Sequence, residues 1–585
     1  MNFLSQEQGD IEAERMQYHE TKHVAYDDVT LEANQRRSAN YKPNIWKYNF
    51  LQSLTSKYQE EEYRGRFEKL VEDVKGQYDR EWGLLPKLEF IDSVHKLGLG
   101  SHFHYEIEEA LTSINSNPIV KEDLYTNALC FRLLRQHGYK VSSADMLRVV
   151  TDENGIFKKS SIEEDIKGVL ELFEASHLAF DNESIFDEVK VYTMNILKEA
   201  FSNSATKIES NLLKHVVHAL ELPSHRRVPW FDVRWHINEY GNREHMNIDL
   251  LQLSKLNFNI IQATLQKDLK ESCRWWTNQG LKEHMNFARD RLVECFMCSV
   301  GLISDPQYGS FRKCLTKVIN FILVIDDIYD IYGSIEELKQ FTDAVIRWNK
   351  SEIEQLPECM EGCFQSLYDV NNDIAHEFEM ENTCNHVLPH LKKVVRIYPS
   401  SWEDYCKALY VEAKWYSKGY TPSLDEYLSN AWISSAGPVI LVHTFIAIIQ
   451  DHDEAVTDDQ MKDFQDLFYN ISLIIRLCND LGTTVFAQAE QERGDAASSV
   501  ICCMRDMNVS EEIARNHIKG MIDRAWKSIN GKCFTHNQTH LVPSLQPFVS
   551  IITNASRVAQ TLYQHGDGFG DQDKEIREQI LSLVT

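Results

Sequence analysis

The chain has 585 residues, 43% of them hydrophobic, and a net charge of −27 at neutral pH. This length exceeds what one hydrophobic core usually serves, so we expect two domains. The negative charge, without a long block of lysine and arginine, argues against a nucleic-acid-binding protein. No run of about 18 apolar residues occurs, so we expect no membrane span.

Residues 1–45 are polar and irregular, and we treat them as a separate segment. Their acidic start, MNFLSQEQGDIEAERM, lacks the apolar core of a secretory signal and the acid-poor composition of a transit peptide. The 13 cysteines have no regular spacing, and one C-x-x-C pair, Cys295 and Cys298, lacks a second pair that could complete a zinc site. Reduced thiols and a cytoplasmic location are therefore expected.

Residues 46–240 are predicted to form one helical domain. Apolar residues recur there at three- and four-residue spacing in segments such as EYRGRFEKLVEDVKGQY, KLEFIDSVHKLGLG, YTNALCFRLLRQHGY and IEEDIKGVLELFEASHLAF. Loops rich in Gly, Asn, Ser or Pro separate these segments, and strand-like alternation is nearly absent. The stretch ELPSHRRVPWFDVRW, with two prolines and a basic cluster, marks the junction to the next domain.

Residues 241–585 are predicted to form a second domain of longer helices. The segments LLQLSKLNFNIIQATLQKDLKESCRWW, Phe287–Val300 and FILVIDD have broad apolar faces, which is typical of helices around a central cavity. The sequence therefore predicts an all-α protein with two helical domains.

Three aspartates follow the apolar run FILVI: Asp326, Asp327 and Asp330. On a straight helix Asp326 and Asp330 lie about 40° apart, and Asp327 lies about 100° from Asp326. Such carboxylates suit Mg²⁺, which binds through oxygen ligands and bridges to phosphates. A solvated acidic helix end is the alternative interpretation.

The segment NISLIIRLCNDLGTT repeats this design with an apolar run followed by polar residues. Asn479 and Thr483 are i, i+4 neighbours that offer oxygen ligands on one helix face, and Arg476 precedes them. Two such polar helix segments, if they face each other as two walls of one site, could hold Mg²⁺ ions with a diphosphate between them. Arg289 and Arg291 could then bind the diphosphate oxygens, which indicates a site that ionises a diphosphate.

The sequence resembles the plant class I terpene synthases over essentially its whole length. The resemblance rests on RRSANYKPNIW, in which Arg36 and Arg37 are followed after eight residues by Trp46, and on RWW, ARDR, DDIYD, RLCND and YQHGDGFG in this order. Within the family the chain is most similar to the α-farnesene synthases, through QRRSANYKPNIWK, ELPSHRRV, GKCF and HGDGFGDQ.

The resemblance implies an N-terminal α-barrel domain and a C-terminal catalytic helical bundle of the class I type. The resemblance implies that the first metal motif consists of Asp326, Asp327 and Asp330, and that the second includes Asn479 and Thr483. It further implies that the diphosphate is bound by Arg289, Arg291 and Arg476. The segment that caps the site would include Tyr563 and Asp567. The pair Arg36 and Arg37 resembles the N-terminal strand that helps to close this cap.

The implied substrate is farnesyl diphosphate, with geranyl diphosphate as an alternative, and the implied cofactor is Mg²⁺, three ions, with Mn²⁺ as a substitute. Ionisation in an apolar, aromatic-rich cavity followed by proton loss would give an acyclic sesquiterpene, (E,E)-α-farnesene above all. Nerolidol, linalool or monoterpene synthesis, a chain-elongating prenyltransferase, and a helical binding protein without catalysis are the alternatives. We expect a monomer with no nucleic-acid or membrane partner.

Cys298 bears on the product, because many cyclising relatives have Trp at this position. An aromatic face stabilises a nearby cation, and Cys offers little of this support, so cyclisation should compete poorly with early deprotonation. Simple packing is the alternative role for Cys298.

Two departures from the family pattern predict a weakened catalyst. The acidic ligand expected eight residues after Asn479 is Ala487, and the next acid, Glu490, lies about 4.5 Å too far along a straight helix. The segment Val395–Ser401, VRIYPSS, introduces a proline into what resembles a continuous helix. This segment and FAQ, residues 486–488, are either retained intron ends or genuine loop variation.

Overall fold

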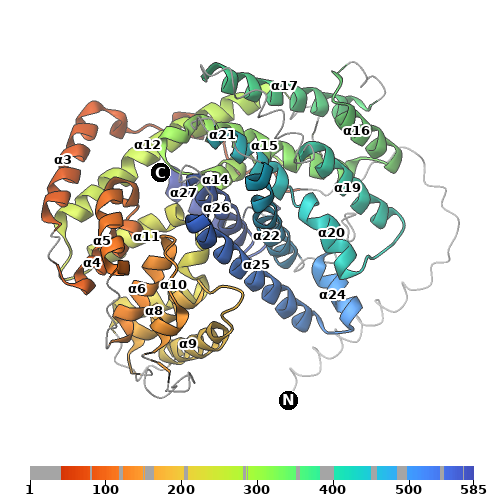
Figure 1. Ribbon diagram of the computed structural model, residues 1–585. Coiled ribbons are helices and arrows are strands. Elements are labelled where there is room, and N and C mark those ends of the chain that lie inside the picture. Colours follow the sequence, from red (N-terminus) through yellow and green to blue (C-terminus); the bar gives the residue numbers. More distant parts are fainter. Residues whose placement is uncertain are drawn as a thin grey trace, which may run out of the picture. The chain divides into compact units, whose positions relative to one another are not determined.

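The computed structural model describes most of the chain as helices joined by loops (Figure 1). The described residues are 41–78, 82–116, 123–148, 150–151, 164–202, 209–280, 285, 287–350, 356–381, 401–449, 458–483, 497–539, 546–570, 572 and 574–585. No β-strand occurs in these ranges, so the predicted all-α fold is confirmed. Ser38–Thr585 form one compact unit, and the description below concerns that unit.

The first group of helices corresponds to the predicted N-terminal helical region. These helices are α2 (Tyr48–Ser53), α3 (Glu61–Gln77), α4 (Leu84–Lys96), α5 (His104–Ser116), α6 (Leu124–Gln136), α7 (Ser143–Leu147), α8 (Ile166–Ser176), α9 (Ile185–Ser202) and α10 (Ser210–Glu221). Side-chain caps stabilise the N-termini of two of these helices. The side chain of Asp123 accepts from the backbone N–H of Thr126 at the start of α6, and that of Asp165 accepts from the backbone N–H of Gly168 at the start of α8.

A small core lies among α6, α8, α9 and α10, and a buried arginine is fixed beside it. The guanidinium of Arg135 makes a two-pronged ion pair with Glu183 through two hydrogen bonds of 2.6 Å. It also donates to the carbonyls of Leu178 and Val141 and lies between the rings of Phe131 and Phe180. A buried charge of this kind is tolerated because nearly all of its hydrogen-bonding capacity is used.

The predicted junction is a short 3₁₀ turn, Ser224–Arg226, followed by α11 (Pro229–Gly241). Pro229 occupies the first turn of α11, where its missing N–H costs nothing. Arg226 of this turn and Lys190 of α9 both form ion pairs with Asp523 of α25 (Glu511–Thr539), at 2.5 and 2.6 Å. The junction therefore connects the N-terminal helices to a helix near the end of the chain.

The second group of helices is longer and surrounds the candidate site. These helices are α12 (Ile248–Gln279), α14 (Leu292–Leu302), α15 (Gly309–Asp327), α16 (Ile335–Arg347), α17 (Glu358–Glu381), α19 (Ser401–Ser417), α20 (Leu424–Ser434), α21 (Gly437–Ile449), α22 (Asp458–Thr483), α24 (Ser499–Met507), α25 (Glu511–Thr539), α26 (Gln546–Leu562) and α27 (Lys574–Val584). In Figure 1 they run from yellow-green to blue.

Helices α12, α14 and α15 pack against one another in the middle of this group. The long helix α12 is preceded by Asn247, whose side chain caps it, and followed by Gly280, which takes the left-handed conformation that favours glycine. Every residue of α14 is buried. The predicted helix over Phe287–Val300 is wrong at its start, because the chain up to Arg291 is not helical and α14 begins at Leu292.

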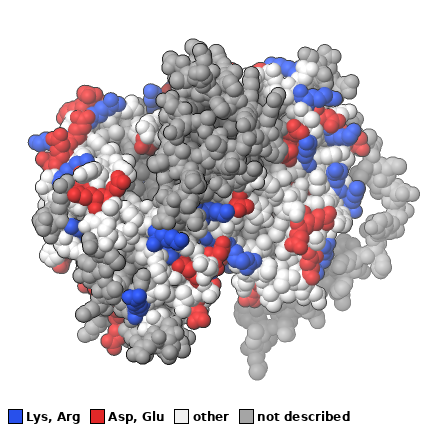
Figure 2. Space-filling view, viewed as in Figure 1, with Lys and Arg blue, Asp and Glu red and all other residues white. Residues whose placement is uncertain are grey.

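One large hydrophobic core extends from Trp46 to Val584 and includes residues of both helix groups. The predicted boundary near residue 240 therefore lies within a continuous core and stays a prediction. On the face shown in Figure 2, acidic and basic side chains are interspersed, and the described residues form no continuous basic patch there. None of the described helices has the length and apolar character that a membrane crossing requires.

Replacing Arg135 by Leu should destabilise the protein, because the largely shielded Glu183 would lose its counter-charge. We expect a loss of about 3–5 kcal/mol in the free energy of unfolding, measured as a lower urea midpoint by circular dichroism. Lys167→Ala is the control, since Lys167 and Glu89 form an exposed ion pair that should contribute little. Equal midpoints for the two variants would contradict this account of Arg135.

Candidate active site

Two adjacent carboxylates at the end of α15 have different surroundings. The side chain of Asp326 is 27% exposed and lines a cavity, whereas that of Asp327 is fully buried and points elsewhere. After Asp327 the chain continues as a π-helical turn, Ile328–Tyr332, which contains the half-buried Asp330. The straight helix assumed from the sequence thus ends at Asp327, and such wider turns are frequent at functional sites.

Asp327 is neutralised by Arg289 and by a tyrosine from the start of the described chain. The backbone N–H of Arg289 donates to Asp327 at 2.7 Å, and its guanidinium Nε lies 2.9 Å from the other carboxylate oxygen. The hydroxyl of Tyr41 donates to that same oxygen at 2.9 Å. Burial raises the pKa of Asp327 above its ordinary value, although the guanidinium of Arg289 opposes part of this rise.

Arg289 also reaches Asp326, with its Nη2 donating at 2.6 Å. One guanidinium therefore bridges both carboxylates and at the same time lines the cavity. Arg289 thus lies next to the predicted metal motif, and its role in binding a diphosphate stays a prediction.

The structure places Arg291 outside the cavity lining. Its side chain is almost completely buried and donates to the backbone carbonyls of Phe569, Gly570 and Lys42 at 2.8–3.1 Å. Arg291 thus connects the segment before α14 to the beginning and the end of the described chain. Its predicted contact with a diphosphate stays a prediction.

The second predicted wall is the end of α22. Arg476 and Asn479 line the cavity, and Arg476 Nη1 donates to Asn479 Oδ1 at 3.4 Å. Thr483 lies one turn beyond Asn479 and donates its hydroxyl to the Asn479 carbonyl at 2.9 Å. Asp480, by contrast, accepts hydrogen bonds from the hydroxyl of Tyr427 and from the backbone N–H of Ser499. It therefore connects α22 to α20 and α24.

A buried acid is connected to Arg476 through the hydroxyl group of a serine. Glu412 on α19 accepts from the Ser434 hydroxyl at 2.5 Å, and the same hydroxyl accepts from Arg476 Nη2 at 3.1 Å. Burial raises the pKa of Glu412, whereas the charge of Arg476 lowers it. The Nε of Arg476 is buried and has no hydrogen-bond partner among the described residues. Arg476 lines the cavity, where an arginine can donate to an anion.

The cavity lies between the two walls and is largely aliphatic. Its apolar lining consists of Leu302, Ile319, Ile322, Leu323, Ala436, Ile440, Ile475, Ala555, Val558, Ala559 and Leu562, and its aromatic lining consists of Tyr405, Tyr563 and Phe569. Among the described lining residues, aliphatic side chains thus outnumber the aromatic ones that the sequence analysis expected. Cys298 on α14 lines this cavity, as the sequence predicted, so its side chain contributes to the shape of the apolar space.

The segment after α26 covers one end of the cavity. Tyr563, Asp567 and Phe569 all line it, as the sequence predicted for the first two. Burial raises the pKa of Tyr563 above its ordinary value, with Asp567 adding to this effect. The segment lies directly on α22: a Cβ atom placed on Gly482 would lie 2.8 Å from the carbonyl oxygen of Gly566 and 3.0 Å from that of Tyr563.

Several predicted residues lie outside the cavity lining or outside the described chain. Asp330 and Thr483 each lie one turn beyond a lining residue, Asp326 and Asn479. The residues outside the described ranges are Arg36, Arg37, Ala487 and Glu490, together with 486–488 and 395–400. Of the N-terminal motif, Trp46 is described, and its Nε1 donates to the buried Glu294 of α14 at 2.8 Å.

The sequence gave no individual role to Tyr41, Tyr405, Glu412 or Ser434, which the structure places at or behind the cavity. Tyr41 lies inside the N-terminal motif that also contains Trp46, so its membership of that motif could have indicated a role. The other three lie on helices whose apolar spacing indicates burial but not a polar partner. Only the folded contacts identify them.

The donor set of the two walls fits a hard divalent cation. Asp326 offers a partly exposed carboxylate, and across the cavity Asn479 offers an amide oxygen. Asp330 and Thr483 could add oxygens one turn away. Mg²⁺ prefers such oxygen ligands and keeps several waters, and Arg476 and Arg289 in the same lining suit the phosphate groups that accompany it.

Comparison with known proteins identifies the family. The terpene synthase N-terminal domain matches residues 45–220, and the metal-binding domain of the same family matches residues 277–528. The chain belongs to the terpene synthase family. It is 55% identical over 558 residues to an (E,E)-alpha-farnesene synthase from Malus domestica, covering 94% of each chain. It is 54% identical to an alpha-farnesene synthase from Ricinus communis, covering 94% of this chain and 95% of that one.

Solved structures agree with this assignment. Limonene synthase with 2-fluorolinalyl diphosphate superposes with a TM-score of 0.85 at 37% identity, covering 94% of this chain and 99% of that one. Isoprene synthase from Populus x canescens, in complex with three Mg²⁺ ions and dimethylallyl-S-thiolodiphosphate, gives a TM-score of 0.80 at 38% identity, covering 93% and 99%. The predicted family, the two-part helical fold and the enzyme class are confirmed.

The close contact at Gly482 generates a prediction. Gly482→Ala should push the Tyr563–Gly566 turn away from α22 and displace Tyr563 and Asp567 from the cavity. Because small misplacements at a reacting centre are costly, we expect kcat/KM for farnesyl diphosphate to fall by about tenfold or more. Gly520→Ala on α25 is the control, since its nearest side-chain atom is 3.7 Å away. Unchanged activity of Gly482→Ala would contradict the proposed packing.

Proposed function

We propose that this enzyme converts farnesyl diphosphate into (E,E)-α-farnesene and diphosphate. The observation that carries the proposal is the 55% identity to an (E,E)-alpha-farnesene synthase over nearly the whole length of both chains. The site supports it, because an aliphatic cavity opens between a carboxylate wall at Asp326 and an amide wall at Asn479. In the proposed complex the hydrocarbon chain would contact the aliphatic lining, with its diphosphate between the two polar walls.

The arginines would bind the leaving group. Arg289 and Arg476 lie on opposite walls of the cavity, and both can donate to diphosphate oxygens. The bond between the allylic carbon and oxygen breaks with its electron pair going to the diphosphate. Donors already in position stabilise the charge that develops there, which lowers the barrier to ionisation.

Three Mg²⁺ ions, when bound at the two walls, would neutralise the charge of the diphosphate, and Mn²⁺ could replace them. We propose Asp326 and Asp330 as the first ligand group, and Asn479, Thr483 and Glu490 as the second. Asp327, which the sequence also predicted as a ligand, is paired with Arg289 and Tyr41 in the structure and would instead hold Arg289 in place. In the structure Arg289 donates to Asp326. Once Asp326 holds a cation, the Nη2 of Arg289 would be available to the anion, while its Nε stays beside Asp327.

The cavity would also determine the product. Aliphatic side chains exclude water from the allylic cation and so prevent its capture as an alcohol. Cys298, deeply buried in the lining, presents no aromatic face to a cyclised cation. Loss of a proton from carbon forms the last double bond, with the diphosphate as acceptor, so the product is an acyclic hydrocarbon.

The test is a comparison of substrates and products. We expect kcat/KM to be higher for farnesyl than for geranyl diphosphate, and gas chromatography to show mainly acyclic C15 hydrocarbon. The reaction without divalent metal is the control and should release no diphosphate. A preference for the C10 substrate, or a mixture dominated by cyclic products, would overturn the proposal.

Asp326→Ala should abolish turnover while the fold stays intact. The carboxylate acts on charge that develops as the bond breaks, so the loss should appear in kcat. We expect less than about a tenth of the wild-type kcat to remain. Asp343→Ala, on the exposed face of α16, is the control and should behave as wild type. Substantial activity of Asp326→Ala that still depends on Mg²⁺ would show that the metal assignment is wrong.

A further inference from the structure

Three potential metal ligands meet between α10 and α11, on residues other than those of the candidate active site. His218 lies on α10, and Asp232 and His236 lie one turn apart on α11. Both imidazole Nε2 atoms approach the same carboxylate oxygen, Asp232 Oδ2, at 2.9 and 3.5 Å. The three ligand atoms all lie within 4.8 Å of one another, and the side chains are largely shielded from solvent.

Neighbouring side chains hold these groups in place. The ring of Trp235 stacks on His218 at 3.9 Å with an interplanar angle of 4°, and it contacts His236 edge-on at 4.9 Å. Arg227 lies 3.7 Å from the other oxygen of Asp232, Oδ1. Its guanidinium also donates to the carbonyls of Leu222 and His218. Metal ligands are typically oriented by such supporting contacts.

We propose that His218, Asp232 and His236 bind one Zn²⁺ ion, at a site separate from the catalytic Mg²⁺ site. Two imidazole nitrogens and one carboxylate oxygen are a typical zinc donor set, whereas Mg²⁺ prefers oxygen ligands alone. The ion would bind Oδ2 and both Nε2 atoms and leave the contact of Arg227 with Oδ1 intact. A hydrogen-bonded His–Asp–His cluster without metal is the competing explanation.

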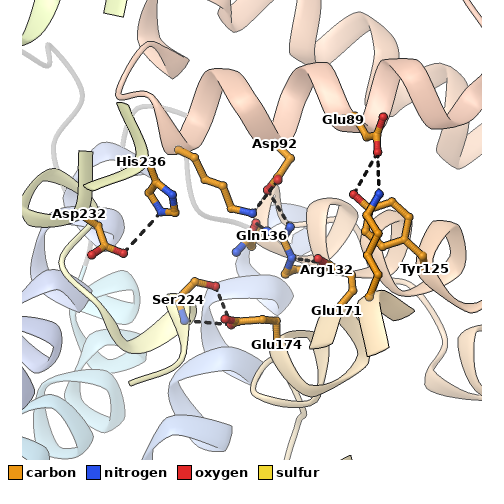
Figure 3. A network of polar contacts seen from close by, with 12 residues as sticks. Glu89, Asp92, Tyr125, Arg132, Gln136, Glu171, Glu174, Ser224, Asp232 and His236 are labelled. Carbon is orange, nitrogen blue, oxygen red and sulfur yellow. Dashed lines mark hydrogen bonds and ion pairs between the residues drawn. The ribbon is translucent and has the colours of Figure 1, made fainter. Parts of the chain in front are cut away.

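The fourth coordination position would open into a cavity of about 730 Å³, which Asp232 and His236 line. The cationic side chains on its wall are Lys96, Arg132, Arg227 and Arg557. Figure 3 shows Asp232 and His236 beside the network in which Arg132 pairs with Asp92 and Glu171. A water molecule from this cavity would complete a tetrahedral site.

The ion would join α10 to α11. Because α11 packs against α12 and α14, a metal here would stabilise the connection between the two helix groups. Ligand binding to the folded state alone raises the melting temperature. Zinc should therefore stabilise the wild-type protein even when Mg²⁺ is absent.

The test uses the full-length protein, dialysed against a chelator and re-equilibrated with Zn²⁺ in excess Mg²⁺. Zinc per chain is measured by mass spectrometry after gel filtration. We expect about one Zn²⁺ per chain in the wild type and in Asp326→Ala, and loss of that ion in His218→Gln and in His236→Gln. His215→Gln, one turn earlier on α10, is the matched control and should retain it. Equal zinc contents in the wild type and in His236→Gln would overturn the proposal.

A second measurement keeps the test decisive if a variant fails to fold. Co²⁺ bound to the wild type should give the visible spectrum of a tetrahedral site with nitrogen and oxygen ligands. It should lack the charge-transfer band of a cysteine thiolate. A thiolate band, or an octahedral spectrum alone, would place the metal elsewhere and contradict the proposed site.

Discussion

The arrangement of the site depends on how the protein neutralises two adjacent carboxylates at the end of a buried helix. Asp327 is fully buried, and an isolated charge there would be costly. The backbone and side chain of Arg289 and the hydroxyl of Tyr41 compensate it. This fixes Arg289 beside Asp326, which is partly exposed to the cavity. Neutralising one carboxylate inside the protein thus positions the cation that can act on a substrate.

The same requirement brings distant parts of the chain together. Arg291, two residues after Arg289, donates to carbonyls at Lys42 and at Phe569. These bonds hold the beginning and the end of the described chain near the helix that bears Cys298. The covering segment, which includes Tyr563, in turn rests on Gly482 of α22. The two polar walls, the cavity and the segment that covers it are therefore in direct contact. A displacement of one of these parts should displace the others.

Much of this was predictable from the sequence, because helical periodicity and motif spacing are local properties. The long helix α12, the apolar α15 before its aspartates and the wall at Asn479 were all predicted. The start of α14 was not, because Arg289 and Arg291 use their hydrogen bonds for tertiary contacts that no periodicity reveals. The different surroundings of Asp326 and Asp327 were missed for the same reason. The expected mechanism also assumed an aromatic-rich cavity, whereas most of the described apolar residues that line it are aliphatic.

The most direct test of the central claim is a crystal structure with Mn²⁺ and inorganic diphosphate, using anomalous scattering to locate the metal. The account predicts peaks within coordination distance of Asp326 on one wall and of Asn479 on the other. The diphosphate should lie between these peaks, in contact with Arg289 and Arg476. Metal bound at neither wall, or a diphosphate bound away from both arginines, would contradict the claim that these two walls form the ionising site.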